Sequence, residues 1–350
     1  MRKILAGAAV LASGALLIAG CSSSGSSSSS AAGGATATGA AAAAPVTVRL
    51  GFLANITHAP ALIALKNGYF KQDLGSAGTV NATAFSSGTQ ETTAILSGQL
   101  DAAYVGPNPA INAWQKSSGQ AIKIVSGVAN GGASIVVKPS VTSAAQLKGQ
   151  SLATPSLGNT QDVALRYWLK QNGLTTSATG GGDVSIKPTT PNSAAVLEFK
   201  SGQIAGASEP APYDVEMVSD GGKVLLSEPG VTTVLMVTQS FLSAHPDIVA
   251  DLLRANLQAL GYIQSDPSGA QAAANAELGA YTGKPLKASV VAASFKEITF
   301  TDDPDAASLT ADAKQATSVG LLQSVNLNGI FDLGPLNTIL KAAGEPTVSS

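Results

Sequence analysis

Segments rich in β-branched residues alternate with helical segments through much of this chain of 350 residues. Between residues 46 and 128 the predicted strands are Val46–Phe52, Thr79–Phe85, Leu100–Val105 and Ala121–Val128. Helices fit between them, because Pro60 suits the first turn of a helix and Gly68 and Gly98 suit helix ends. The alternation predicts βαβ units and a mostly parallel sheet. Such sheets bind ligands just beyond the carboxyl ends of their strands, so we look for a site there.

A second series of the same kind follows the glycine-containing segment Ala129–Ala133. Its predicted strands are Ser134–Lys138, Gln150–Ala153, Asp183–Lys187, Ile204–Ser208, Lys223–Leu226 and Thr232–Val237. From Pro246 onward the pattern is wholly helical. We therefore predict an α/β fold with two Rossmann-like lobes joined by a two-strand hinge, and a helical C-terminal part. The crossings are expected near Val128–Gly132 and Glu228–Thr233, so that residues 45–130 and 234–350 form one lobe and residues 131–233 the other.

The composition of the chain excludes several classes of function. The part from Pro45 to Ser350 exceeds the length at which a single core usually splits into lobes. The formal net charge is −2, only 12% of residues are charged, and Lys and Arg form no cluster, which excludes nucleic-acid binding. The sequence has no Ser-His-Asp spacing, no zinc-ligand cluster and no Walker-type loop. We therefore expect no enzyme, no metal and no cofactor.

Polar and small residues follow the ends of the predicted strands in the first lobe. The residues concerned are Asn55, His58, Ser87, Gly88, Thr89, Gly106, Asn108 and, at the first crossing, Asn130. They supply neutral hydrogen-bonding groups and glycine backbone, without Lys or Arg. We predict that they line a site for a small polar or anionic ligand. His58 has two possible roles, because it could donate to a bound oxyanion or could belong to a capped turn.

The segment Thr154–Gly173 repeats this arrangement in the second lobe. It predicts a strand, a turn, and a helix that is capped by Asn159 and ends at Gly173. A helix N-terminus leaves backbone N–H groups unpaired and favours negative charge. We predict that an oxyanion is bound here by Gly158, Asn159, Thr160 and Gln161, and that the glycine allows close backbone approach. Asp162 and Arg166, four residues apart, are expected to pair on the helix surface.

The N-terminal residues predict targeting. Arg2 and Lys3 precede the apolar run Ile4–Ala19, which together indicate a secretory signal in residues 1–20. The sequence Ile18-Ala19-Gly20 directly before Cys21, the only cysteine, resembles a bacterial lipoprotein signal, and this resemblance implies a lipid on Cys21. Residues 21–44 are almost only Ser, Gly, Ala and Thr, which predicts a flexible tether. The expected location is extracytoplasmic, with the protein anchored to the cell membrane by this N-terminal lipid.

Several motifs of the folded part belong together. In the first lobe they are Gly51-Phe52, His58-Ala59-Pro60, Gly68-Tyr69-Phe70, Ser97–Ala102 and Gly106-Pro107, and later ones are Gly158–Arg166, Asp303-Pro304 and Phe331–Leu333. This set resembles the substrate-binding proteins of ABC importers, in the aliphatic-sulfonate, taurine and nitrate branch, over Pro45–Ala343. The resemblance implies a type II periplasmic-binding fold that closes on a small anionic solute. It also implies that the protein, as a monomer, delivers this solute to a transmembrane permease with a cytoplasmic ATPase.

One departure from the family leaves the ligand open. Where such proteins often carry aromatic residues around Glu-Pro-Trp, this chain has Glu209-Pro210-Ala211-Pro212-Tyr213. A carboxylate repels a sulfonate, so Glu209 is expected to contact a ligand amine or to form an interlobe hydrogen bond. An aliphatic sulfonate, taurine-like ones included, is the first expectation; nitrate, bicarbonate and a thiamine-pyrimidine precursor are alternatives. A sensor domain and an enzyme on the same scaffold are alternatives of another class, although the related enzymes are cytoplasmic.

Overall fold

The computed structural model of the protein describes residues 44–350. The predicted signal at residues 1–20, the proposed lipid-bearing Cys21 and the tether up to residue 43 lie outside the described residues. Within residues 44–350, no helix has the length and the apolar character that a membrane crossing requires.

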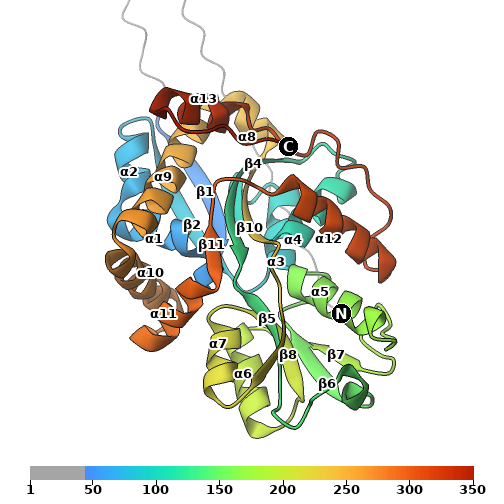
Figure 1. Cartoon of the computed structure of the whole chain (residues 1–350). Helices are drawn as coiled ribbons and strands as arrows, with labels where there is room; N and C mark the ends of the chain where they lie inside the picture. The colour runs from blue at the N-terminus through green and yellow to red at the C-terminus, as the bar shows by residue number, and fades with distance from the viewer. Residues whose placement is uncertain (1–43) are drawn as a thin grey trace, which may run out of the picture. The chain divides into compact units, whose positions relative to one another are not determined.

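Two β-sheets, each with its own helices, make up this part of the chain (Figure 1), and both are mixed. The larger has the strand order β11-β4-β10-β3-β1-β2. Its strands are β1 (Val46–Leu53), β2 (Gly78–Phe85), β3 (Ala102–Val105), β4 (Ile122–Gly131), β10 (Val231–Thr238) and β11 (Ile298–Phe300). Strand β1 is parallel to β2 and β3, whereas β10 is antiparallel to β3 and β4. The expectation of a wholly helical C-terminal part is wrong at β11. This strand has only three residues and forms by pairing with the edge of β4, which leaves no periodic signal in the sequence.

The smaller sheet has the strand order β7-β6-β8-β5-β9. Its strands are β5 (Ala133–Val137), β6 (Ser151–Thr154), β7 (Ser185–Pro188), β8 (Gly206–Pro210) and β9 (Lys223–Ser227). We call the larger sheet with its helices lobe 1 and the smaller sheet with its helices lobe 2. The chain enters lobe 2 through Gly131 and Gly132, whose positive φ angles of 72° and 70° favour glycine. It returns through residues 228–230, where Gly131 N donates to Gly230 O at 2.8 Å and joins the two crossing segments.

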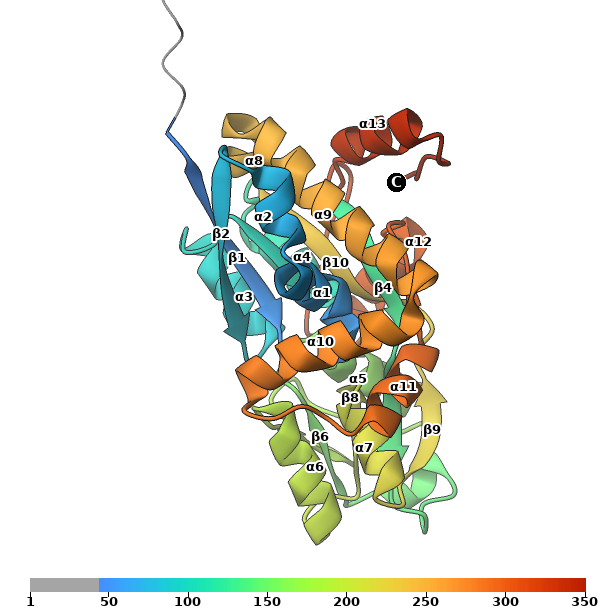
Figure 2. The same ribbon diagram turned by 90° about the vertical axis from the view of Figure 1, so that its left-hand side faces the viewer.

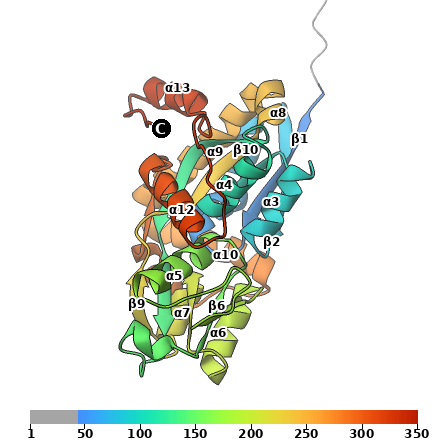
Figure 3. The ribbon, with the colours of Figure 1, turned by 90° about the vertical axis from the view of Figure 1, so that its right-hand side faces the viewer.

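Helices cover both faces of the lobe 1 sheet. One face carries η1 (Ile56–His58), α1 (Ala59–Asn67), α2 (Tyr69–Leu74), α8 (Gln239–Ala244), α9 (Pro246–Ser265), α10 (Pro267–Thr282), α11 (Ala288–Lys296) and α13 (Gly334–Ala343), most of them seen in Figure 2. The other carries α3 (Gly88–Leu96), α4 (Pro107–Lys116) and α12 (Ala306–Ser318), seen in Figure 3. Each face has its own core, one around Phe52 and Leu252 and the other around Ile111 and Ile124. The sheet is thus buried on both sides, which explains its nearly continuous apolar strands.

Lobe 2 is built in the same way on a smaller scale. Its helices are η2 (Ala144–Leu147), α5 (Thr160–Gln171), α6 (Asn192–Ser201) and α7 (Tyr213–Ser219). Along β5, Ile135 and Val137 pack in a core with Leu165 of α5, whereas Val136 packs in another core with Phe199 of α6. This alternation follows from the two-residue period of a strand, and it fixes α5 on one face of the sheet and α6 and α7 on the other.

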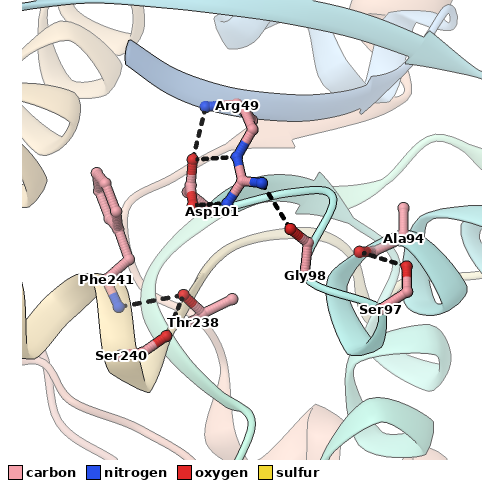
Figure 4. A network of polar contacts seen from close by, with 8 residues as sticks. All are labelled: Arg49, Ala94, Ser97, Gly98, Asp101, Thr238, Ser240 and Phe241. Atoms are coloured by element: carbon pink, nitrogen blue, oxygen red, sulfur yellow. Dashed lines mark hydrogen bonds and ion pairs between the residues drawn. The ribbon is translucent and has the colours of Figure 1, made fainter. Parts of the chain in front are cut away.

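A polar network fixes the amino-terminal end of β3 against β1 (Figure 4). The main-chain N and the Nε atom of Arg49 both donate to Oδ2 of Asp101 at 2.9 Å, and the Nη1 atom of Arg49 donates to the Gly98 carbonyl at 2.5 Å. In the same view Thr238, at the end of β10, accepts a hydrogen bond from Phe241 N at 3.2 Å. The register of β1 and β3 is therefore set at this end, and their carboxyl ends present the segments that follow them.

Candidate functional site

A cavity of about 510 Å³ lies between the two lobes. Lobe 1 lines it with the segments that follow β1, β2 and β3, and with the end of α10 and the chain beyond it. Lobe 2 lines it with the residues before and at the start of α5, with Pro191–Ser193, and with Pro210–Tyr213. The cavity thus lies at the carboxyl ends of parallel strands from both sheets, where ligand sites of open α/β sheets occur.

Eight of the predicted site residues line this cavity, namely Asn55, His58, Ser87, Gly88, Gly106, Asn159, Thr160 and Gln161. They lie at or next to the N-termini of α1, α3, α4 and α5. The first N–H groups of each helix have no intrahelical partner, and the helix dipoles favour negative charge at this end. Four such helix ends from two lobes therefore make the cavity suitable for an anion.

The structure places the other five predicted residues away from the cavity lining: Thr89, Asn108, Asn130, Gly158 and Glu209. The Thr89 hydroxyl instead donates to Ser156 Oγ at 3.3 Å and connects the two lobes. The amide nitrogens of Asn108 and Asn130 turn toward the segment Asp305–Asp312, to the Asp312 carbonyl at 3.4 Å and the Asp305 carboxylate at 3.5 Å. Position in the sequence therefore did not predict the side-chain directions of Asn108 and Asn130.

The backbone conformation at position 158 favours glycine, which is a reason other than the expected one. Its φ angle is 75°, in the left-handed region, and a Cβ atom there would meet nothing within 4 Å. Its N–H donates to Asp162 Oδ2 at 2.8 Å. The conformation of the turn therefore favours glycine here, and close backbone approach to a ligand stays a prediction.

Asp162 and Arg166 form a buried ion pair, which corrects the expectation of a surface pair. Both side chains have an exposed fraction of 0%, and Nε of Arg166 donates to Oδ1 of Asp162 at 2.9 Å. The same carboxylate accepts from Thr154 Oγ1 at 3.2 Å and from Gly158 N. Burial raises the pKa of Asp162, and Arg166 and the Gly158 N–H oppose this rise. The pair thereby holds the turn that carries Asn159, Thr160 and Gln161.

His58 is a neutral donor in the cavity wall. It is 1% exposed, and burial lowers its pKa to about 3, so the ring is uncharged at neutral pH. Its Nδ1 atom accepts from Leu53 N at 3.2 Å, which leaves the proton of the neutral ring on Nε2. The sequence left two roles open for His58. The structure is compatible with both, because Nδ1 takes part in a hydrogen bond within the turn and the Nε2–H group is left to donate to a ligand.

Two amide side chains are oriented by hydrogen bonds to present further donors. Asn55 Oδ1 accepts from Thr57 Oγ1 at 2.8 Å, which turns the Asn55 amide nitrogen outward. Asn159 caps α5 as predicted, with Oδ1 accepting from Asp162 N at 2.9 Å. Its Nδ2 donates to Gln161 Oε1 at 3.1 Å, so Gln161 can offer only its Nε2 protons to a ligand. Neutral donors from both lobes are therefore fixed before any ligand binds.

A second part of the wall was missed from the sequence. It is apolar and aromatic with two charges, and includes Phe85, Tyr213, Glu216, Leu278, Tyr281, Lys284 and Leu286. Burial and the charge of Asp220 raise the pKa of Glu216, while Lys284 and Lys287 lower it. Four of them, Leu278, Tyr281, Lys284 and Leu286, lie in the last turns of α10 or directly after it, where no local pattern signals a site. Only the packing of α10 against the cleft brings these four residues there.

Glu209 lies beneath this wall and not in it. It is completely buried on β8, and neither carboxyl oxygen has a hydrogen bond of good geometry to a described residue, although the Asn192 side chain lies near enough to lower its pKa. Burial and then the charge of Asp214 raise its pKa well above the usual value, so that the protonated form is favoured. No interlobe hydrogen bond of Glu209 is found among residues 44–350.

Residues 44–350 contain no group of three or more His, Cys, Asp or Glu side chains placed to hold a metal ion.

A family model described as the NMT1-like family matches residues 41–278, which is more than half of the chain. The chain belongs to the NMT1-like family. No curated protein sequence was found to match it.

Solved structures share the fold of this NMT1-like chain. The alkanesulfonate-binding protein SsuA from Xanthomonas axonopodis pv. citri, bound to MOPS, is 19% identical with a TM-score of 0.66, over 81% of this chain and 96% of that one. The periplasmic nitrate-binding protein NrtA from Synechocystis PCC 6803 is 16% identical with a TM-score of 0.74, over 86% and 90%. The aliphatic sulphonate binding protein SsuA from Escherichia coli is 19% identical with a TM-score of 0.61, over 78% and 91%. The periplasmic-binding fold that the sequence motifs implied is confirmed.

Proposed function

We propose that the protein is the extracytoplasmic solute-binding component of an ABC importer and that it captures an organic sulfonate between its lobes. The observation that carries this proposal is the cavity wall, which combines neutral donors at four helix N-termini with an apolar and aromatic part. A sulfonate stays ionised at biological pH, so it requires donors and no protonated base. The neutral His58 and the oriented amides of Asn55 and Gln161 meet this requirement.

The size of the cavity favours an organic anion over nitrate or bicarbonate. One water molecule takes about 30 Å³ of liquid volume, so an anion of four heavy atoms fills only a small part of about 510 Å³. Cavities of this size are typical of sites for organic ligands. The aromatic rings of Phe85, Tyr213 and Tyr281 would then cover the organic part of the ligand.

We further propose that lobe 1 closes on lobe 2 when the ligand binds. Contacts between the lobes support a closed arrangement here, since Tyr213 OH donates to the Ala54 carbonyl at 3.1 Å and Lys170 Nζ to the Ser318 carbonyl at 2.6 Å. A ligand that contacts both lobes binds the closed form better than the open one and so shifts the population toward it.

The proposal includes a lipid on Cys21 and a transmembrane permease as partner of the monomeric binding protein. The Ser-, Gly- and Ala-rich residues 22–44 would then keep the lobes close to the membrane surface, where they can reach the permease.

The proposal is tested by a thermal-shift screen of the purified full chain. The panel contains alkanesulfonates of increasing length, MOPS, taurine, nitrate, bicarbonate and pyrimidine precursors of thiamine. A ligand that binds only the folded state stabilises it by RT ln(1 + [L]/Kd), so we expect sulfonates to raise the Tm. A shift with nitrate, bicarbonate or a pyrimidine alone would contradict the sulfonate class.

A matched pair of variants on α5 localises the binding. Gln161→Leu removes a donor from the cavity wall and is expected to abolish the shift, whereas Gln171→Leu at the other end of the same helix should leave it unchanged. An undiminished shift in Gln161→Leu would contradict the site assignment.

A further inference from the structure

A second cavity, of about 350 Å³, lies next to the segment by which the chain returns to lobe 1. Its walls come from α5 of lobe 2, from α12 of lobe 1 and from the connection between β9 and β10. Thr160, at the start of α5, lines both this cavity and the larger one. Its Oγ1 atom is buried and has no hydrogen-bond partner among the described residues.

The charged groups in this wall are acidic. Glu228 and Asp312 line the cavity, and no Lys, Arg or His is among the described residues that do so. The nearest lysine along α5, Lys170, donates instead to the Ser318 carbonyl at 2.6 Å. Glu228 Oε1 accepts from Ser208 Oγ at 2.9 Å, whereas Asp312 Oδ2 is buried without a hydrogen-bond partner among residues 44–350. Within the part of the chain that the structure describes, neither of these two neighbouring carboxyl groups thus has a counter-ion.

The raised pKa values of the two carboxyl groups indicate that the cavity lacks a positive charge. Burial raises the pKa of Asp312, and the charges of Glu228 and Asp305 raise it further. Burial also raises the pKa of Glu228, to about 7. A cation between these groups would remove the repulsion and supply the missing donor.

The rest of the wall favours an organic cation over a metal ion. Tyr167 and Trp168 of α5 contribute aromatic rings, and Leu226, Pro229 and Val231 contribute apolar surface. A metal ion would need more ligands than two carboxyl groups, and no metal-holding cluster occurs in residues 44–350. An ammonium group, in contrast, interacts favourably with both carboxylates and aromatic faces.

We propose that this second cavity binds an organic ammonium ion with a small aromatic or aliphatic body. The ammonium group donates to Asp312 and Glu228, and the body lies against Tyr167 and Trp168. The site does not depend on which solute the larger cavity takes. Because its walls come from both lobes, an occupant would contact both of them.

Isothermal titration of the full chain with phenethylammonium chloride at about pH 8 tests the proposal, because Glu228, with a pKa of about 7, and the probe are then largely charged. We expect saturable binding, with a Kd on the order of 1 mM or below. The neutral analogue 2-phenylethanol should bind at least tenfold more weakly. Equal binding of the two compounds, or no saturable binding of the ammonium ion, would overturn the proposal.

Variants locate the probe. Glu228→Gln combined with Asp312→Asn removes both charges and should weaken binding at least tenfold, with the Tm measured to verify folding. Ala311→Phe fills the cavity from an exposed position of α12 and should also prevent binding. In a Trp114→Phe background Trp168 is the only tryptophan, so its fluorescence should change with the same saturation curve. Binding that survives Ala311→Phe, or that leaves Trp168 fluorescence unchanged, would place the probe elsewhere and refute the assignment.

Discussion

Gly106 of lobe 1 lies directly against Thr160 of lobe 2. A Cβ atom at Gly106 of lobe 1 would lie 2.6 Å from Oγ1 of Thr160 in lobe 2, where ordinary contacts begin at 3.4 Å. The backbone of Gly106 has φ −66° and ψ 155°, which an alanine adopts without strain. Gly106→Ala should therefore leave lobe 1 intact and disfavour only the closed arrangement.

The size of the effect follows from this contact. Thr160 is 6% exposed and β-branched, so its side chain has little freedom to move away. Overpacking of this kind costs about 1–3 kcal/mol. Because the cost falls on the closed form alone, the ratio of closed to open molecules should fall roughly 5- to 150-fold.

The assay uses the hydrogen bond between Thr89 and Ser156. Their hydroxyl oxygens are 3.3 Å apart across the lobes, so a Thr89→Cys, Ser156→Cys pair should form a disulfide only in the closed form. The native cysteine, Cys21, is replaced by serine to avoid other pairings. The rate of disulfide formation under mild oxidation then reports the closed population, from which the closed-to-open ratio is obtained, and Gly106→Ala should reduce this ratio by the factor above.

Two further variants make the reasoning falsifiable. Thr160→Ala removes an oxygen that has no hydrogen-bond partner among the described residues, so it should restore the rate in the Gly106→Ala background. Gly88→Ala is the matched control, because its Cβ would meet Pro109 Cγ at 2.6 Å within lobe 1 and should lower stability without affecting closure. Parental cross-linking in Gly106→Ala, or no recovery with Thr160→Ala, would refute the argument.

Three other predictions concern single residues. Asp162→Asn leaves the charge of buried Arg166 uncompensated and should cost about 3–5 kcal/mol in urea unfolding, against less than about 1 kcal/mol for Asp251→Asn in a partly exposed pair; equal losses would contradict this. Burial raises the pKa of Glu91 well above its usual value, so the folded state keeps this proton longer than the unfolded chain, and stability falls as the pH rises toward the folded pKa. Glu91→Gln should therefore flatten the fall in unfolding free energy between about pH 5 and pH 8, and an unchanged slope would exclude this role. Cys21→Ala should release the protein from the membrane fraction in cell fractionation and abolish labelling by radioactive palmitate, whereas full membrane retention would argue against the lipid anchor.

Local signals in the sequence were sufficient for most of the strands and helices and for part of the site. The predicted strand Val46–Phe52 differs from β1 by one residue, because alternation and β-branching are properties of adjacent residues. The cap at Asn159 was predicted correctly, because an N-cap needs only its own side chain and an N–H group of the first turn. Cavity residues such as Ser87 and Gly106 were found because strand ends in a parallel sheet point to one edge.

Tertiary structure decided what depends on distant parts of the chain. The spacing of Asp162 and Arg166 gave the pair, but its burial is set by the packing of α5, and the guanidinium also donates to the distant Ser177 carbonyl. Lys284 reaches the cavity only because α10 packs across the cleft. Glu209 matched the family motif, yet the pleat of β8 turns it beneath the wall. Periodicity and capping are local and therefore readable in the sequence, whereas burial depth and side-chain direction result from contacts between segments far apart in it.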